Sequence, residues 1–388
     1  MKKVAIRGPL LSLSGYGNHA RQVARWLFEK ENLEIITQIL PWGMTPWLVN
    51  PDLEDGLVGK IMSRSMGHQG KFDVSFQIQL PNEWDSNLAN YNVGVSAFVE
   101  TDICNPEWIQ ACNKMDHIVV PSQHVKSVID STGGIRSDLP VSVIPEAFFD
   151  DILRPPSGDL NIDIQTAFNL LIFGQITGNN PETDRKNTFY TVKWLCEVFR
   201  DDPQAGIILK TNQGTNTTID KKLTTNMVTQ LLREVRSGPF PRFYLLHGHM
   251  LPEEVNQLYK HPKINGLVSA TRGEGYGLPL LEAAASGLPV LATNWSGHLD
   301  FLNKEKFIKF NYELKDINSA KIDSQIFVKG SKWAEVDEED FKQKVIKFRK
   351  ANQIPRQWAK DLSSSLLESH SFNSIKQIYD SIFRQVIE

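Results

Sequence analysis

Glu274 and Glu282 stand eight residues apart, with a glycine-rich turn between them. Carboxylates accept hydrogen bonds from hydroxyl groups, and the backbone N–H groups of a helix N-terminus, here 275–278, suit a phosphate. A ligand that combines a neutral polyol with a diphosphate fits both, and this describes a nucleotide sugar. From spacing alone a plainer alternative stays open, in which Glu282 complements the helix dipole and Glu274 is solvated.

A strand, a loop and a helix must position these glutamates. The run 264–270 is apolar and β-branched, which predicts a strand, whereas 271–277 holds three glycines and predicts a loop. Pro279 suits the first position of a helix, because its φ is preset and it needs no donor, and residues 280–286 then favour helix. A second strand at 289–293 completes a β-loop-α-β unit with a right-handed parallel crossover. This topology brings the loop to the carboxyl edge of a sheet, where open α/β proteins bind ligands.

Length and composition predict two domains and a cytoplasmic protein. The chain has 388 residues and 41% hydrophobic content, and single cores seldom exceed about 250–300 residues. A net charge of −3 gives no reason to expect a nucleic-acid partner. The three cysteines, Cys104, Cys112 and Cys196, show no Cys-x-x-Cys spacing and indicate reduced thiols. No run approaches the roughly 18 apolar residues of a transmembrane helix, and peripheral membrane contact is left open.

Strand and helix patterns alternate in both halves of the chain, which predicts an α/β domain in each. Strands are expected at 3–8 and 93–99 among others, and a helix over 185–200 opens the second alternation. The segment 150–166 loses periodicity and contains two adjacent prolines, so it is the best candidate for a linker. Three helical segments are expected after residue 337.

Residues 15–20 spell G-x-G-x-x-A, which nominally matches a dinucleotide-binding fingerprint. The first glycine comes several residues after the strand, and the acidic residue expected about 20 residues later is offered only by Glu34, at the start of the next strand. We therefore favour a glycine-rich loop that lets another group approach a helix N-terminus. An NAD-dependent enzyme that uses Gly15 and Gly17 remains an alternative.

The chain resembles the retaining glycosyltransferases of family 4, also called group 1. The segment that carries the resemblance is GEGYGLPLLEAAASGLPVLATNWSG, which is similar to the family's E-G-F-G-x-P-x-x-E-A-x-A-x-G-x-P-V pattern, with Tyr276 in the Phe position. Supporting matches cover most of the chain: FYLLHGHMLPEEVNQLY, DRKNTFYTVKWLCEVF, VETDICNPEW and DHIVVPSQHVKSV. The resemblance implies a GT-B fold, with two Rossmann-like α/β/α domains facing each other across a cleft. It places an acceptor domain at 1–155, completed by a C-terminal helix at about 371–388, and a donor domain at 156–370.

The resemblance also implies a role for each candidate site residue. Glu282 would hold the ribose hydroxyls of the nucleotide, Glu274 would contact the transferred sugar near its anomeric carbon, and Lys186 would face the donor phosphates. A cation there would stabilise the charge that develops on the leaving diphosphate. The remaining donor-binding positions are glycines and backbone amides: Gly15, Gly17, Gly275, Tyr276, Gly277 and Leu278.

Two departures from the family pattern affect the expected site. Gln175 stands where the family often has an arginine, and Arg185 either supplies the missing charge or is simply solvated. Many members have a histidine on the acceptor side, whereas this chain has Glu100, Thr101 and Asp102. The two acids either bind an acceptor hydroxyl or cap the following helix. No Asp-x-Asp and no metal-ligand spacing of His or Cys is present, so no metal and no cofactor are expected.

The expected function is transfer of a hexose from a UDP- or GDP-sugar donor to a hydroxyl acceptor such as a glycan, with retention at the anomeric carbon. A nucleotide-sugar-binding protein without transferase activity is the first alternative, because of Gln175 and the missing histidine. The NAD-dependent enzyme is the second.

Overall fold

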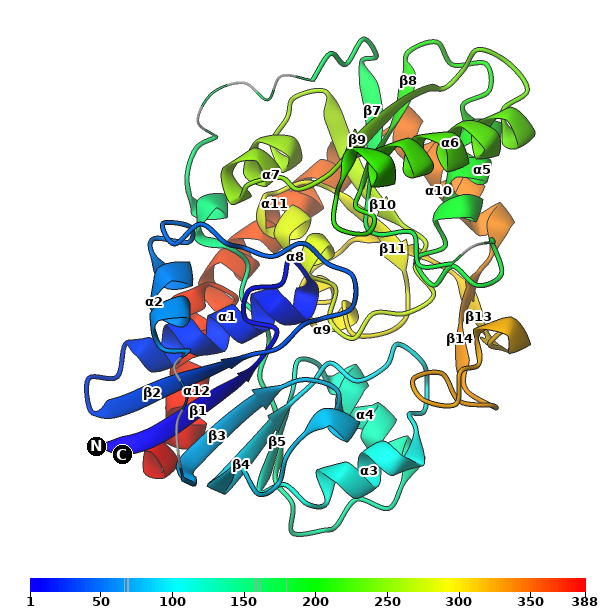
Figure 1. Ribbon diagram of the computed structural model, residues 1–388. Coiled ribbons are helices and arrows are strands. Elements are labelled where there is room, and N and C mark those ends of the chain that lie inside the picture. Colours follow the sequence, from blue (N-terminus) through cyan, green and yellow to red (C-terminus); the bar gives the residue numbers. More distant parts are fainter. Residues whose placement is uncertain (66, 68–69, 157, 159, 161, 179) are drawn as a thin grey trace. The chain divides into compact units, whose positions relative to one another are not determined.

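The computed structural model of the protein describes residues 1–65, 67, 70–156, 158, 160, 162–178 and 180–388 (Figure 1). The chain forms two compact units. The first comprises residues 1–147, 323–328 and 372–388, and the second comprises 148–322 and 329–371. The linker expected at 150–166 falls within the second unit, and its residues 157, 159 and 161 lie outside the described residues.

The first unit is built on a parallel sheet with the strand order β2-β1-β3-β4-β5-β6. Its strands are β1 (Lys2–Gly8), β2 (Leu33–Ile39), β3 (Phe72–Ile78), β4 (Ala89–Val95), β5 (His117–Val120) and β6 (Val141–Val143). Its helices are α1 (Gly15–Phe28), α2 (Leu57–Ser63), α3 (Pro106–Cys112), α4 (Gln123–Thr132), α12 (Phe372–Ile387) and the 3-10 turn η1 (Pro81–Glu83). The expected strand at 93–99 is wrong at its end, because Phe98 has a φ of 52° and cannot continue a strand.

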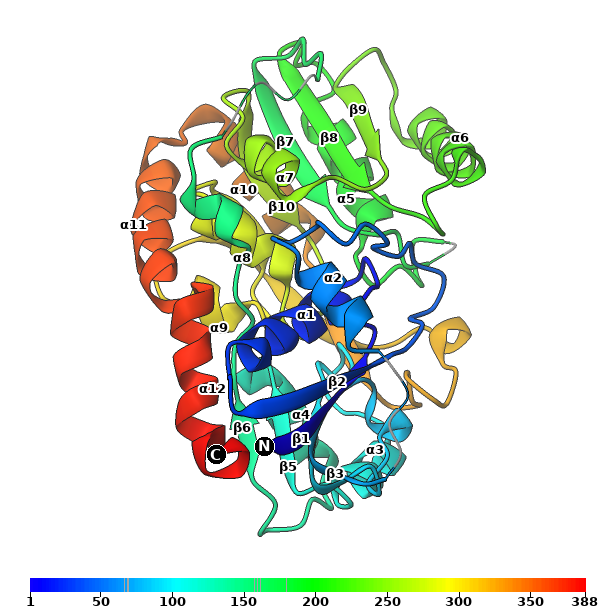
Figure 2. The ribbon, with the colours of Figure 1, turned by 60° about the vertical axis from the view of Figure 1, so that its left-hand side comes forward.

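Helix α12 packs along the first unit's own core, beside α1 and the sheet (Figure 2). Its apolar stripe includes Tyr379, whose ring lies 4.8 Å from that of Trp26, and Phe383, whose ring lies 5.2 Å from that of Phe76. The Trp26 indole N–H also donates to Asp380 at 2.8 Å. Because burying one such side chain stabilises a protein by about 1.5–3 kcal/mol, the last helix is an integral part of this unit.

The two glycines of the 15–17 segment differ in what the fold requires of them. Ser14 caps α1 by accepting from the Gly17 N–H at 3.0 Å. A Cβ on Gly17 would lie 2.0 Å from the Ser12 carbonyl oxygen, whereas one on Gly15 would meet open space.

We therefore expect Gly17→Ala to lower the free energy of unfolding by about 1–3 kcal/mol, since the loop 9–14 must move away. Gly15→Ala is the matched control and should stay within about 1 kcal/mol of the wild type. Urea unfolding of both variants measures the difference. Equal stability of the two variants would show that the close approach at Gly17 is unimportant.

The second unit contains another parallel sheet, with the strand order β12-β11-β10-β7-β8-β9. Its strands are β7 (Phe168–Phe173), β8 (Ala205–Thr211), β9 (Arg242–His247), β10 (Ile264–Ser269), β11 (Val290–Thr293) and β12 (Ile308–Phe310). Its helices are α5 (Thr188–Val198), α6 (Thr218–Val235), α7 (Pro252–Tyr259), α8 (Leu278–Ala285), α9 (Leu299–Leu302), α10 (Glu338–Lys350) and α11 (Gln353–Ser369), with 3-10 turns η2 (Asp150–Leu153) and η3 (Ser319–Lys321). An antiparallel hairpin, β13 (Tyr312–Asp316) and β14 (Lys332–Val336), was not expected.

Strand order decides which loops of the second unit meet. β7 is the first strand of its sheet in the chain, and it lies between β10 and β8. Leu267 of β10 pairs with Leu171 of β7 in parallel, so the loops that follow these two strands leave the same edge side by side. Ligand sites of open α/β sheets form at such a switch in strand order.

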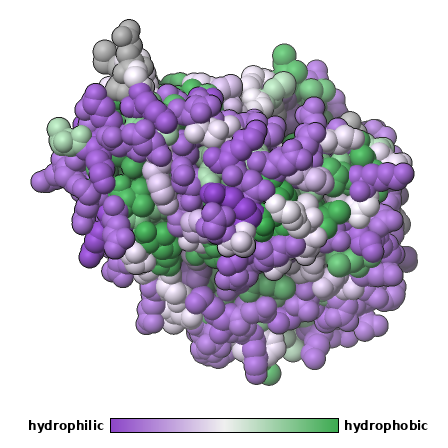
Figure 3. All heavy atoms as spheres, turned by 90° about the horizontal axis from the view of Figure 1, so that it is seen from below, coloured by the Kyte–Doolittle hydropathy of each residue, from purple (hydrophilic) through white to green (hydrophobic). Residues whose placement is uncertain are grey.

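Polar residues predominate on the face of the molecule that Figure 3 shows, and hydrophobic residues lie among them in patches. Within the described part of the chain, no helix is both long enough and apolar enough to cross a membrane.

Candidate functional site

The loop between β10 and α8 is held by the segment that follows β11. The Glu274 N–H donates to the Ser296 hydroxyl at 2.9 Å, and the Gly297 N–H donates to the Glu274 carbonyl at 2.9 Å. A Cβ on Gly297 would lie 2.1 Å from the Gly275 carbonyl oxygen, so only glycine allows this approach. Gly277, with a φ of 100°, is the N-cap of α8. The first residue of this helix is Leu278, and not Pro279 as expected. The sequence therefore builds a rigid turn at the helix N-terminus.

Glu274 is buried between two cations that come from the loop after β7. Its Oε1 and Oε2 lie 2.6 and 2.8 Å from the Lys186 ammonium, and its Oε2 lies 3.3 Å from Arg185 Nη1. Burial alone would raise the pKa of this carboxyl, but the charges of Lys186 and Arg185 outweigh burial and lower the pKa to about 2. Glu274 is therefore ionised at neutral pH, and the structure brings three of the predicted site residues together.

Arg185 belongs to this cluster, so the alternative of a solvated side chain is wrong. Only 13% of its side chain is exposed, and it also donates to the Gly273 carbonyl at 2.5 Å. Gln175, in contrast, is exposed. The helix expected over 185–200 begins three residues late, because Asn187 is left-handed, with a φ of 56°. This turn directs Arg185 and Lys186 toward Glu274 before the helix starts.

Glu282 has a different environment from Glu274, although both are buried. Its Oε2 accepts a hydrogen bond from the Tyr259 hydroxyl at 3.3 Å. Burial is the dominant effect and raises the pKa of Glu282 to about 8, against a smaller lowering by that bond. At neutral pH this carboxyl is mostly protonated and can both donate and accept hydrogen bonds. Two carboxyl groups with pKa values shifted apart are a mark of functional sites.

The raised pKa of Glu282 should make the free energy of unfolding depend on pH. Between pH 4.5 and about 8 the folded protein keeps a proton on Glu282 that the unfolded chain has already released. The contribution of this group to the free energy of unfolding is therefore fully present below pH 4.5 and is lost as the pH rises through about 8. We expect wild-type stability to fall relative to Glu282→Gln over this window, by at most about 1.4 kcal/mol per pH unit. Urea unfolding at several pH values tests this, and parallel pH profiles of the two proteins would contradict it.

Arg272 is a residue that the sequence pattern did not single out. It is fully buried, pairs with Glu335 of β14 at 2.6 Å and donates to the carbonyls of Pro181 and Asp184 at 2.6 and 2.8 Å. Its own backbone N–H donates to the Arg185 carbonyl at 2.9 Å. Arg272 therefore fixes the loop that carries Arg185 and ties it to the hairpin.

Asn187 is a second residue that the sequence pattern did not assign. Its side chain is buried, and neither its amide nitrogen nor its amide oxygen has a hydrogen-bond partner among the described residues. The capping bond to α5 comes instead from Asp184, whose Oδ2 accepts from the Thr188 N–H at 2.7 Å. A buried amide without a partner is costly unless a ligand or a water satisfies it.

The remaining candidate residues are distributed as follows. The Tyr276 ring packs edge-to-face on Phe301 at 5.3 Å and belongs to the hydrophobic core of the second unit. Gly15 and Gly17 lie at the start of α1 in the first unit, whereas the contacts of Glu274 described above come from the second unit. Glu100 and Asp102 are partly exposed in the first unit. The side chain that caps α3 is Asn105, which accepts from the Glu107 N–H.

Comparison with known proteins gives a family match for part of the chain and a fold for the whole chain. A family model described as Glycosyl transferases group 1 matches residues 244–357. A sucrose-phosphate synthase from Thermosynechococcus elongatus aligns over 100% of this chain and 99% of its own, with 12% identity and a TM-score of 0.65. Anabaena HepE, solved with UDP and glucose, aligns over 99% and 100%, with 14% identity and a TM-score of 0.64.

The pneumococcal O-GlcNAc transferase GtfA, solved with UDP and GlcNAc, aligns over 81% of this chain with 13% identity and a TM-score of 0.50. This chain spans 57% of that protein's length. A search of curated protein sequences gave no match. At these identities the solved structures show the fold. The segment 244–357, which contains Glu274 and Glu282, matches the model of the glycosyl transferases group 1, and the whole chain has the GT-B fold.

Proposed function

We propose that the protein transfers a hexose from a UDP- or GDP-sugar to a hydroxyl acceptor, such as a glycan, with retention at the anomeric carbon. One observation carries the proposal: the Lys186 ammonium lies within 2.8 Å of both Glu274 carboxylate oxygens, in the loop that leads into α8. Such a site offers a cation to a leaving diphosphate and an anion to the positive charge that builds at an anomeric carbon. The family match over 244–357 supports glycosyl transfer in general.

Each residue has a proposed part. Lys186 and Arg185 neutralise the diphosphate, and the backbone N–H groups of 275–278 bind its oxygens. The protonated Glu282 carboxyl accepts from one ribose hydroxyl and donates to the other. Glu274 leaves Lys186 partly when the donor arrives, and turns toward the sugar. Since Lys186 and Arg185 supply the positive charge, we propose that transfer needs no metal ion. The contributions of Gly15 and Gly17 remain predictions from the sequence.

Mass spectrometry of the products tests the proposal. The wild type should transfer a hexose from at least one UDP- or GDP-sugar to an acceptor in a glycan library, with full activity in EDTA. Glu274→Gln should abolish transfer. NMR of the anomeric proton should show the same configuration in donor and product. Loss of activity in EDTA would refute the metal-free proposal, and an inverted product would refute retention.

A further inference from the structure

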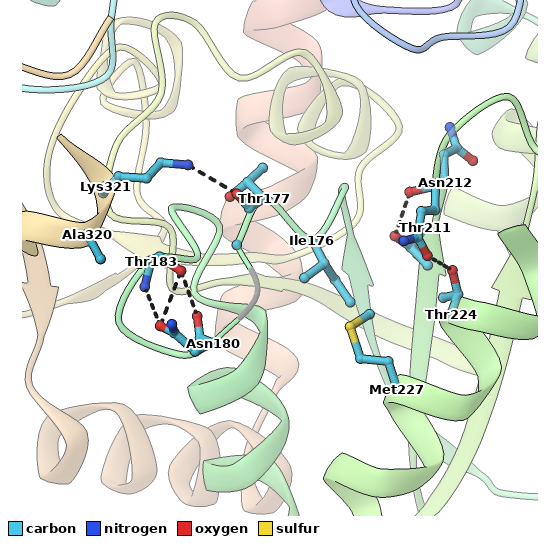
Figure 4. Close-up of a pocket in the computed structure, with 12 residues that line it drawn as sticks. Ile176, Thr177, Asn180, Thr183, Thr211, Asn212, Thr224, Met227, Ala320 and Lys321 are labelled. Carbon is cyan, nitrogen blue, oxygen red and sulfur yellow. Dashed lines mark hydrogen bonds between the residues drawn. The ribbon is translucent and has the colours of Figure 1, made fainter. Parts of the chain in front are cut away.

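A pocket of about 430 Å³ opens in the second unit apart from the two glutamates, neither of which lines it (Figure 4). Its walls come from the loops that follow β7 and β8, from α6 and from η3, at the start of the loop between β13 and β14. Its volume falls within the range of about 300–1,000 Å³ that is usual for small-molecule sites. The proposed transfer reaction does not use this pocket.

Three amide side chains of the lining use their oxygens within the protein. Asn180 Oδ1 accepts from the Thr183 N–H at 3.1 Å, and Asn212 Oδ1 accepts from the Lys210 ammonium at 3.0 Å. Both donors lack lone pairs to offer, so they define which end of each amide is the oxygen. The third, Gln213, accepts from a threonine hydroxyl of α6. Among the described residues, none accepts a hydrogen bond from the three amide nitrogens, so these nitrogens are candidate donors for a ligand.

Two lysines bring positive charge to this pocket. Lys321 lines it, and its ammonium donates to the Thr177 carbonyl at 3.1 Å. Lys210 is 3% exposed and donates to Asn212 Oδ1. Its ammonium also donates to the neutral Gly248 carbonyl at 2.7 Å. Burial lowers the pKa of Lys210 to about 8, partly offset by the charge of Glu254.

No described residue of the lining carries a carboxylate. Asp184, which accepts from the lining residue Thr177, is already engaged with backbone donors, and so is Asp220 at the start of α6. Asp184 accepts from the N–H groups of Thr177 and Thr188, and Asp220 accepts from the N–H of Thr217 at the cap of α6. Their charges are thus directed to backbone donors, and a ligand with an acidic group would meet Lys321.

Threonine hydroxyls complete the lining with acceptors. Three of them donate their protons to protein oxygens and keep oxygen lone pairs for a ligand: Thr183, Thr211 and Thr224. The pocket therefore combines amide donors, hydroxyl acceptors and a cation. We propose that it binds a sugar-sized, polyhydroxylated ligand that carries one anionic group, such as a sugar phosphate. The proposal is independent of the transfer reaction.

Isothermal titration calorimetry tests it with glucose 6-phosphate, glucose and inorganic phosphate as the probes. The wild type should bind glucose 6-phosphate more tightly than either of the other two. Lys321→Met should weaken that binding about tenfold or more, since it removes a charge-assisted contact. Lys329→Met is the matched control from the same loop, exposed and outside the lining, and should bind as the wild type does.

Asn180→Asp is a second variant that keeps the shape and the bond from Thr183 but replaces the amide donor by a negative charge, and it should also weaken binding about tenfold or more. The double variant Lys186→Met/Glu274→Gln, which removes the ion pair of the Glu274 cluster without leaving a buried charge, should leave glucose 6-phosphate binding unchanged. Absence of binding at millimolar concentrations would overturn the proposal. So would unchanged binding in Lys321→Met, or loss of binding in a folded double variant, which would place the sugar phosphate at the Glu274 cluster.

Discussion

Replacing Lys186 by methionine is expected to lower the rate of sugar transfer by about a hundred- to a thousandfold, the usual effect of removing one preorganised electrostatic contact. The ammonium lies 2.6 Å from Glu274 and is the cation proposed to stabilise the leaving diphosphate. Initial rates with a saturating UDP- or GDP-sugar measure the effect. Normal turnover by a folded Lys186→Met protein would remove the role assigned to this residue.

Loss of folding is the competing explanation, because Lys186→Met leaves a buried carboxylate with Arg185 as its remaining cation. Removing one partner of a buried pair costs about 3 kcal/mol or more. The double variant Lys186→Met/Glu274→Gln is the control, since the neutral pair should recover most of that stability without recovering transfer. If the double variant regained both stability and activity, Lys186 would be a structural residue.

Arg272→Leu is expected to lower the free energy of unfolding by about 3–5 kcal/mol. The guanidinium is fully buried, and its removal leaves Glu335 and the carbonyls of Pro181 and Asp184 without their partner. Urea unfolding should show the loss directly. Arg233→Leu on the exposed side of α6 is the matched control and should stay within about 0.5 kcal/mol of the wild type. Equal midpoints for the two variants would show that the Arg272 contacts do not stabilise this unit.

The turn and helix around Glu274 could be predicted because their signals are local. Three glycines, a proline at the helix start and a Gly287 with a φ of 77° after its end define the element within about one residue. The contact of Glu274 with Lys186 is not local, since 88 residues separate them. It depends on β7 lying beside β10, which apolar strand patterns do not encode. The family resemblance only assigned both residues to one donor site, Glu274 to the sugar and Lys186 to the phosphates.

Features that depend on burial could not be predicted from the sequence, because residue type alone does not show how much water reaches a side chain. An arginine is exposed in most proteins, so the core position of Arg272 could not be read from its type. The protonation of Glu282 depends on how much water reaches it, and the sequence indicated an ordinary carboxylate. The hairpin β13–β14 has mostly exposed residues on β13, so it lacks the apolar alternation that marks a strand.

We propose that the Glu274–Lys186 cluster binds a nucleotide diphosphate sugar. Calorimetric titration of the wild type with a panel of UDP- and GDP-hexoses, and with NAD, tests it most directly. We expect at least one nucleotide sugar to bind, NAD not to bind, and Lys186→Met to weaken the nucleotide-sugar affinity about tenfold or more. Binding of NAD alone, or a nucleotide-sugar affinity that Lys186→Met leaves unchanged, would contradict the account.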